Sequence, residues 1–228
     1  MKKLNYICKL IIALLLIFCV SYSVLFVIAK LSSKIDIKST NSIYMYDKDN
    51  KSFYEGNNGT RKWVKLKDIS KELINATIYS EDKNFYKHNG FDIPRIIKSS
   101  ITNIRTKDLK EGASTITQQY ARNLFLTFDK TWERKIKEAW YAFKLENEYS
   151  KDQILEGYLN TINYGNGILG IENASLYYFN KSAKDLNLAE SSMLAGIPKS
   201  PNNYSPLNDE KVALKRQKVI LNAMIKNN

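Results

Sequence analysis

One uncharged, apolar run constrains the fold more than any other feature of this sequence. It extends from Leu10 to Ala29 and is rich in Leu, Ile, Val and Phe. A helix needs about 20 such residues to cross the hydrocarbon core of a bilayer, so the run predicts a transmembrane helix. A cleaved signal peptide is the alternative, because Lys2, Lys3 and Lys9 precede the run, but no convincing small-residue cleavage site follows it.

The lysines around the run leave its orientation open, and the two cysteines of the chain lie close to it. Three further lysines follow the run, so counting positive charges does not decide which side faces the cytoplasm. Both cysteines, Cys8 and Cys19, lie in or beside the run. The rest of the chain therefore has neither a disulfide framework nor a thiolate metal site.

The chain is basic, with a formal net charge of +12. Such an excess suits an anionic partner, which could be a nucleic acid, a membrane surface or a phosphorylated substrate. Because the predicted anchor ties the chain to a bilayer, we expect one of the last two and no nucleic acid.

The sequence divides into four segments, of which the last is the folded domain. We predict a short cytoplasmic tail at 1–9, the transmembrane helix at 10–29, a linker that can hold a short hairpin at 30–64, and a folded domain at 65–228. Turn-rich residues from Glu55 to Gly59 separate two β-favouring stretches of the linker.

Helical signals dominate the folded domain and predict a mostly α fold. Isoleucines recur at helical spacing at Ile93, Ile97, Ile101 and Ile104. Capping boxes predict helix starts at two pairs, Thr115 with Gln118 and Ser150 with Gln153. Further helices are expected at 131–148, 186–195 and 211–226.

Residues 81–92 gather acids, bases and the only histidine of the chain. A carboxylate such as Glu81, at a helix end that faces a cleft, can serve as a general base. A solvated polar loop is the alternative, since runs of charge are usually exposed. His88 on its own is better explained as a hydrogen-bonding anchor of the loop.

Three other clusters have both a functional and a structural explanation. Residues 112–123 open a helix whose free amides and hydroxyls could bind an anion, but ordinary capping explains Thr115 and Gln118 equally well. Arg134 and Glu138 share a helix face and could form a surface ion pair. The glycine-studded turn at 163–170 favours a structural role, because glycine allows positive φ and close backbone approach.

Taken in order, these clusters resemble the motifs of the penicillin-binding-protein-type peptidoglycan glycosyltransferases, a mostly helical, lysozyme-like family. Glu-Asp-x-x-Phe-x-x-His-x-Gly begins at Glu81, Gly-x-Ser-Thr-Ile-x-Gln-Gln at Gly112, Arg-Lys-x-x-Glu at Arg134 and Ile-Leu-Glu-x-Tyr-Leu-Asn at Ile154. The resemblance spans about residues 65 to 225. Each motif alone would be weak, but the four together are specific.

The resemblance implies polymerisation of lipid II into glycan strands, by inverting attack of an acceptor GlcNAc hydroxyl on a lipid-pyrophosphoryl donor. It implies that Glu81 is the general base, that Glu138 assists on the donor side, and that both face one cleft. The residues expected to bind the donor are Lys98, Ser114, Thr115, Gln118, Gln119, Arg122, Lys130, Arg134, Lys135 and Lys137. A departing pyrophosphate needs cationic stabilisation, which this set supplies.

The resemblance also bears on location, partners and cofactors. It implies a single-pass protein of the bacterial cytoplasmic membrane, with the catalytic domain outside and other cell-wall synthesis proteins as further partners. It leaves the metal site undefined, although magnesium or manganese would neutralise the pyrophosphate; no organic cofactor is expected. Arginine at Arg122, lysine at Lys98 and Asn180 in place of glycine depart from the family pattern.

Two other functions remain open. A lysozyme-like hydrolase would use similar carboxylates to cut glycan strands. A non-catalytic membrane scaffold would keep the fold without the reaction. Ser80 and Lys83 have the Ser-x-x-Lys spacing of a penicillin-binding transpeptidase, but no Lys-Thr-Gly follows. We therefore expect a monofunctional glycosyltransferase.

Overall fold

A computed structural model describes residues 23–37, 43–46, 52–56, 62–106, 112–126 and 131–227. The chain divides into two units, Met1–Ile35 and Asp36–Asn228. In the first unit, residues 23–31 are helical. Among the described residues, no helix is both long enough and apolar enough to cross a membrane. The predicted tail and residues 10–22 of the predicted membrane helix lie outside the described residues, so the membrane helix stays a prediction.

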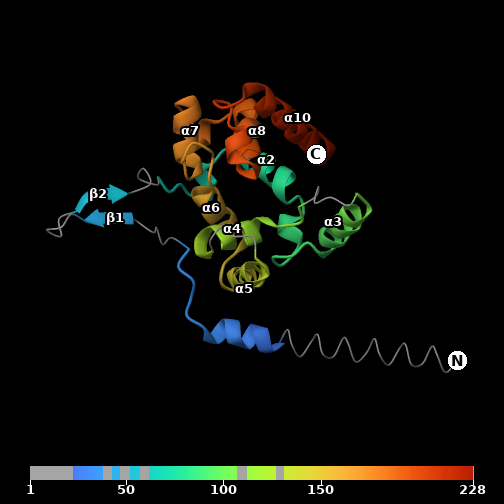
Figure 1. Ribbon diagram of the computed structural model, residues 1–228. Coiled ribbons are helices and arrows are strands. Elements are labelled where there is room, and N and C mark those ends of the chain that lie inside the picture. Colours follow the sequence, from blue (N-terminus) through green and yellow to red (C-terminus); the bar gives the residue numbers. More distant parts are fainter. Residues whose placement is uncertain are drawn as a thin grey trace. The chain divides into compact units, whose positions relative to one another are not determined.

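The second unit contains a short β-hairpin. Strand β1 (Ile43–Tyr46) pairs antiparallel with β2 (Ser52–Gly56), and the register is irregular between Met45 and Tyr46. The hairpin lies in the segment for which the sequence predicts a linker with a short hairpin. The rest of the described unit is helical, so the expected mostly α class is confirmed (Figure 1).

Two groups of helices form the body of the domain. The first group packs α2 (Lys71–Glu81), α8 (Leu188–Gly196) and α10 (Glu210–Asn227) against one another. In Figure 1 these helices lie in the upper part of the domain.

The second group centres on α4 (Ile116–Phe125), which packs against both α5 (Trp132–Glu148) and α6 (Lys151–Thr161). Tyr158 on α6 and Tyr120 on α4 are fully buried and are among the largest side chains of the core.

Shorter elements connect and cover these groups. The remaining α-helices are α3 (Ile93–Thr106), α7 (Ile171–Phe179) and α9 (Pro201–Tyr204). Single turns of 3-10 helix are η1 (Leu66–Asp68), η2 (Phe85–Lys87), η3 (Ala183–Asp185) and η4 (Ile197–Lys199).

The helix starts and ends follow local side-chain chemistry. Both predicted capping boxes are confirmed, with Thr115 and Gln118 at the start of α4 and Ser150 and Gln153 at the start of α6. Such a box satisfies two of the free amides that every helix start leaves. Asn180 ends α7 in the left-handed conformation, with φ of 53°. Asparagine adopts this conformation more readily than most residues, which explains how it replaces glycine here.

Gly157 allows α4 and α6 to approach closely. A Cβ added at Gly157 would lie only 2.1 Å from the hydroxyl of Tyr120, which donates a hydrogen bond to the carbonyl of Ile37. No side chain fits at position 157 unless the buried tyrosine moves. In the turn that follows α6, Gly165, Gly167 and Gly170 all have positive φ, so the structural role predicted for that turn is confirmed.

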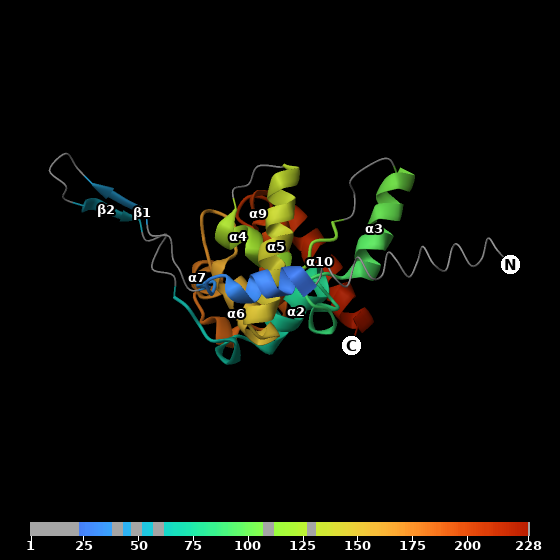
Figure 2. The same cartoon turned by 90° about the horizontal axis from the view of Figure 1, so that it is seen from below.

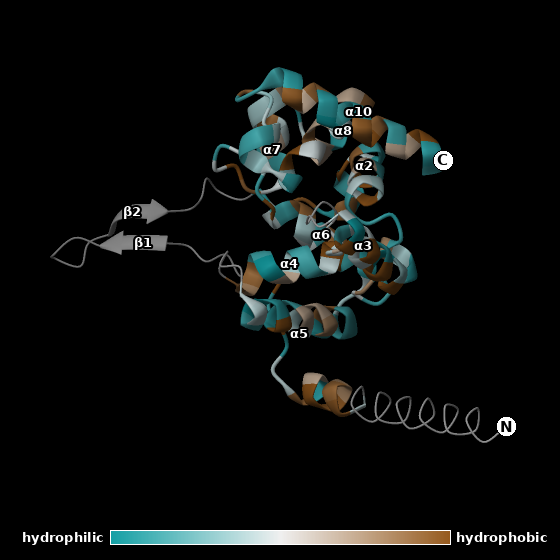
Figure 3. Cartoon of the chain, turned by 45° about the vertical axis from the view of Figure 1, so that its right-hand side comes forward, coloured by the Kyte–Doolittle hydropathy of each residue, from teal (hydrophilic) through white to brown (hydrophobic). Residues whose placement is uncertain are grey.

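Helix α3 has an apolar stripe that the rest of the domain does not cover. Ile93, Ile97, Ile101 and Ile104 are all exposed, and Ser99 is the buried residue of this helix. Figure 2 shows α3 projecting at the side of the body, and Figure 3 shows hydrophobic residues on this helix. The predicted amphipathic helix is thus present, but its apolar face has no partner among the described residues.

Candidate active site

Glu81 lies at the last position of α2, where the two helix groups meet. Its side chain is almost completely buried, with 8% of the residue exposed. Both carboxylate oxygens have partners. Oε2 accepts a hydrogen bond of 3.0 Å from Nε2 of Gln119, and Oε1 lies 3.4 Å from Nη2 of Arg216. These partners come from α4 and α10, so Glu81 is held by both helix groups.

A buried tyrosine fixes the orientation of the Gln119 amide. The hydroxyl of Tyr158 donates a hydrogen bond of 3.1 Å to Oε1 of Gln119, which turns the amide nitrogen toward Glu81. Burial, and then the negative charge of Glu81, raise the pKa of the Tyr158 hydroxyl well above its ordinary value. The hydroxyl therefore stays protonated and remains a donor.

Asp82 connects the end of α2 to the start of α4. Its side chain is buried, and Oδ2 accepts a hydrogen bond of 3.0 Å from the backbone amide of Ile116. A negative charge at a helix start is favourable, because the free amides there carry partial positive charge. Nε2 of His88 lies 2.9 Å from Oδ1 of Asp82. His88 thus anchors the loop that follows α2, as the sequence predicts.

Arg95 joins three segments around Glu81. Its Nη1 bonds to the backbone carbonyl of Glu81, and its Nη2 lies 3.3 Å from the carbonyl of Gly112. Arg95 belongs to α3, so one guanidinium connects α3, the end of α2 and the loop before α4. Thr115 connects the start of α4 to the loop that follows α2, because its hydroxyl donates a hydrogen bond of 2.7 Å to the carbonyl of Gly90.

A second carboxylate, Glu138 on α5, is surrounded by cations. Its side chain is fully buried. Lys135 bonds to Oε1, while Nη1 atoms of Arg134 and Arg122 lie 3.5 and 3.7 Å from Oε2. Lys135 also donates to the hydroxyl of Ser114 at 3.2 Å. Three cations against one carboxylate leave this cluster positively charged.

Helix α4 connects the two carboxylates. Gln119 contacts Glu81, and Arg122 contacts Glu138. Residues three positions apart lie on the same face of a helix. One turn of α4 therefore places an uncharged donor beside the first carboxylate and a cation beside the second.

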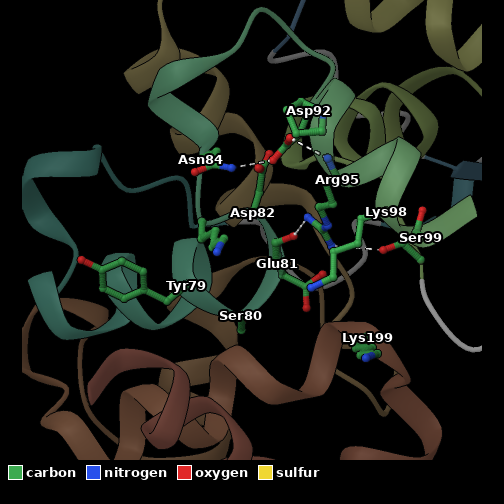
Figure 4. Close-up of a pocket in the computed structure, with 13 residues that line it drawn as sticks. Tyr79, Ser80, Glu81, Asp82, Asn84, Asp92, Arg95, Lys98, Ser99 and Lys199 are labelled. Atoms are coloured by element: carbon green, nitrogen blue, oxygen red, sulfur yellow. Dashed lines mark hydrogen bonds between the residues drawn. The ribbon is translucent and has the colours of Figure 1, made fainter. Parts of the chain in front are cut away.

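Two cavities open beside Glu81. The larger has a volume of about 500 Å³, and its walls include Glu81, Arg95, Lys98 and Lys199. Figure 4 shows Glu81 and Lys98 reaching this cavity and Lys199 entering it from a different segment. The smaller cavity, of about 210 Å³, shares Glu81, Arg95 and Lys199 with the larger one. Its walls also include Ser114, Gln119 and Arg122. A substrate in the smaller cavity would meet Glu81 and several cations, and in the larger cavity it would also meet Asp82 and Asp92.

A family model described as Transglycosylase matches residues 49–225, which is most of the chain. The chain belongs to the transglycosylase family. It is 49% identical to Penicillin-binding protein 2D of Bacillus subtilis (strain 168) over 200 residues, which cover 87% of this chain and 29% of that protein. It is 46% identical to Penicillin-binding protein 1A of Neisseria lactamica over 165 residues, which cover 72% of this chain and 21% of that protein.

The crystal structure of Penicillin-Binding Protein 1A from Haemophilus influenzae is also similar. It matches with a TM-score of 0.42 and 22% sequence identity, covering 84% of this chain and 19% of that chain. The chain thus spans about a fifth to three tenths of the length of the proteins it matches.

The transglycosylase domain places the predicted site residues in different surroundings. Those that line a cavity are Glu81, Lys98, Ser114, Gln119 and Arg122. Arg134 and Lys135 contact Glu138. We expected both carboxylates to face one cleft, but Glu138 lines neither cavity. Glu138 is connected to the wall of the smaller cavity by Arg122, and by Lys135, which bonds to Ser114.

Three of the residues predicted to bind the donor lie elsewhere. The side chains of Thr115 and Gln118 form the capping box of α4 and line neither cavity. Lys137 pairs with Glu133 at 2.6 Å, and both side chains are mostly exposed. Lys130 lies outside the described residues.

The fold brings three further cations to the site that no sequence motif indicates, Arg95, Lys199 and Arg216. Arg95 lies in the isoleucine-rich helix, and its position one turn before Lys98 offers no distinctive signal. Lys199 and Arg216 come from the last third of the chain, where spacing to Glu81 carries no information. Only the tertiary fold reveals these contacts.

One group of possible metal ligands occurs in the described part of the domain, formed by Asp82, His88 and Asp92. Each of its four carboxylate oxygens already accepts an N–H: those of Asp82 from His88 and Ile116, and those of Asp92 from Asn84 and the Arg95 amide. Burial pushes the pKa of Asp92 upward, but the bonds from Asn84 and Arg95 outweigh it and leave the pKa below its ordinary value. In its contact with Asp82, Nε2 of His88 carries a hydrogen and has no lone pair for a metal. A divalent cation would have to break that contact, so the group as arranged does not fit a resident metal.

Proposed function

We propose that this transglycosylase domain polymerises lipid II into peptidoglycan glycan strands. The observation that carries the proposal is the pairing of one cavity-lining carboxylate, Glu81, with a cationic cluster one turn of α4 away. A reaction that releases a pyrophosphate needs both parts: a base for the attacking hydroxyl and positive charge for the leaving group.

In this proposal Glu81 takes the proton of the acceptor GlcNAc hydroxyl. The hydroxyl oxygen bonds to the anomeric carbon of the donor, and the bond from that carbon to the lipid pyrophosphate breaks with inversion. Arg122 and Lys98, which line the cavities, stabilise the departing pyrophosphate, and Ser114 and Gln119 complete the wall of the smaller cavity. Lys135 adds positive charge from behind Ser114, to which it is hydrogen-bonded.

Glu138 then acts through the cations and does not touch the substrate. A fully buried carboxylate that contacts Arg122, Arg134 and Lys135 fixes the positions of their charged groups. Preorganised charges of this kind lower a barrier without reorganising during the reaction. The same surroundings argue against the lysozyme-like hydrolase, in which a second carboxylic acid must protonate a departing sugar oxygen.

Incubation of the detergent-solubilised full chain with labelled lipid II, followed by separation of the products by size, tests the proposal. We expect lipid-linked polymer. Shortening of added glycan strands without polymer would identify the hydrolase. No change in either substrate would contradict both and favour the scaffold.

We also propose that the chain is a single-pass membrane protein with its catalytic domain outside the cytoplasmic membrane. The apolar run from Leu10 to Ala29 and the exposed isoleucines of α3 support this location, because both suit a lipid environment. In intact spheroplasts, external protease should digest the domain while the protein fractionates with membranes. Recovery of undigested protein would contradict the orientation.

A requirement for magnesium or manganese stays a prediction. Since the Asp82, His88 and Asp92 group does not fit a resident ion, we expect any such ion to arrive with the pyrophosphate. Chelation should then slow polymerisation and leave the melting temperature unchanged. A lower melting temperature after chelation would show that the protein itself holds a metal.

A further inference from the structure

Arg216 reaches Glu81 from α10, 135 residues further along the chain. Its Nη2 lies 3.4 Å from Oε1 of Glu81, and only 9% and 10% of the two side chains are exposed. Electrostatic contacts shielded from water in this way are stronger than surface contacts of the same length. The contact therefore holds the Glu81 carboxylate more strongly than a surface ion pair would.

The fold leaves room for this arginine. A Cβ added at Gly196 of α8 would lie 3.0 Å from Cγ of Arg216, so a larger residue would crowd the arginine stem. The guanidinium lies 5.7 Å from the centre of the Tyr204 ring, within the range of a cation–π contact. Arg216 lines neither of the cavities beside Glu81. It thus contacts the carboxylate without facing the space where a substrate would lie.

We infer that Arg216 is a positioning residue for the general base. It holds one oxygen of Glu81 while Gln119 holds the other, so two helices from different parts of the domain fix one orientation of the carboxylate. When the carboxylate is held in one rotamer, a larger fraction of the enzyme has its base oriented toward the acceptor hydroxyl. The inference rests on the proposed function, because it assigns Arg216 a role in that reaction.

Arg216→Met removes the charge and keeps an unbranched apolar stem. In steady-state polymerisation of labelled lipid II by the full chain, we expect kcat to fall about tenfold or more and KM to stay within about twofold, since the arginine does not face the substrate. Arg216→Lys should recover part of kcat. Lys215→Met, an exposed lysine beside it on α10, makes the same change of charge and should behave as the wild type.

A double-mutant cycle separates positioning from general damage to the fold. In a Glu81→Gln background, adding Arg216→Met should lower the residual rate by less than about twofold, because the group that it positions is gone. A further tenfold loss in that background, a rise in KM at constant kcat, or a wild-type rate for Arg216→Met would each overturn the inference.

Two additional readouts keep the result decisive. If Arg216→Met does not fold, Arg216→Lys is used in the same double-mutant cycle.

If the wild-type chain forms no polymer, the proposed function fails. Thermal unfolding of the four proteins of the cycle then still reports whether Glu81 and Arg216 are coupled, and additive changes in melting temperature would overturn the contact itself. A wild-type chain that polymerises lipid II beside an Arg216→Met variant equal to Lys215→Met would overturn only the inference about Arg216.

Discussion

Glu81→Gln should nearly abolish the formation of lipid-linked polymer while the protein stays folded and binds lipid II. The amide has almost the shape of the carboxylate but cannot accept the hydroxyl proton. General-base catalysis typically contributes about 10²–10⁴-fold, so a loss of at least about 100-fold in kcat is expected. Labelled lipid II and separation of products by size measure it.

Glu210→Gln supplies the matched control for this variant. Glu210 is exposed in the first turn of α10, where neutralising one charge leaves both cavities unchanged. It should polymerise as the wild type does. If Glu81→Gln retained the wild-type rate, another group would have to be the base, and if it also failed to bind lipid II, the loss of rate would have a different cause.

Glu138→Gln should lower both the rate and the stability. Neutralising the carboxylate leaves Arg122, Arg134 and Lys135 close together without a counter-charge. Breaking a buried ion pair costs about 3–5 kcal/mol, but these cations can partly turn to solvent, so we expect a loss of about 2 kcal/mol in the free energy of unfolding. Because the cations lose their fixed positions, kcat/KM should fall about 100-fold.

Denaturant unfolding and polymerisation kinetics, measured on the same preparation, check both effects. Glu210→Gln is again the control and should change neither quantity. A Glu138→Gln protein with wild-type rate and stability would show that the three cations need no buried partner. A lower rate with unchanged stability would instead favour direct contact between Glu138 and the substrate.

The parts of this fold that depend on a few neighbouring residues could be predicted from the sequence. The capping boxes at Thr115 and Ser150 need only a side chain and a partner three positions later. Asn180 likewise takes the conformation that its own side chain tolerates. In each case the physical cause lies within one turn of chain.

The surroundings of a residue could not be predicted in the same way. Spacing on α5 indicates an ion pair of Arg134 with Glu138, and that pair is present. It does not show that Arg122 of α4 packs against the same carboxylate and helps to bury it. The periodicity of α3 similarly predicts an apolar face, from Ile93 to Ile104, without showing that this face is exposed.

The contact between Glu81 and Arg216 also concerns the order in which the domain is made. Closing a contact across 135 residues is entropically costly, and such contacts form late compared with local turns. During synthesis, the chain carries Glu81 long before α10 exists to hold it. Under the proposed mechanism, an unfinished or partly folded chain thus lacks the oriented base, and the domain reaches its full rate only when α10 packs into place.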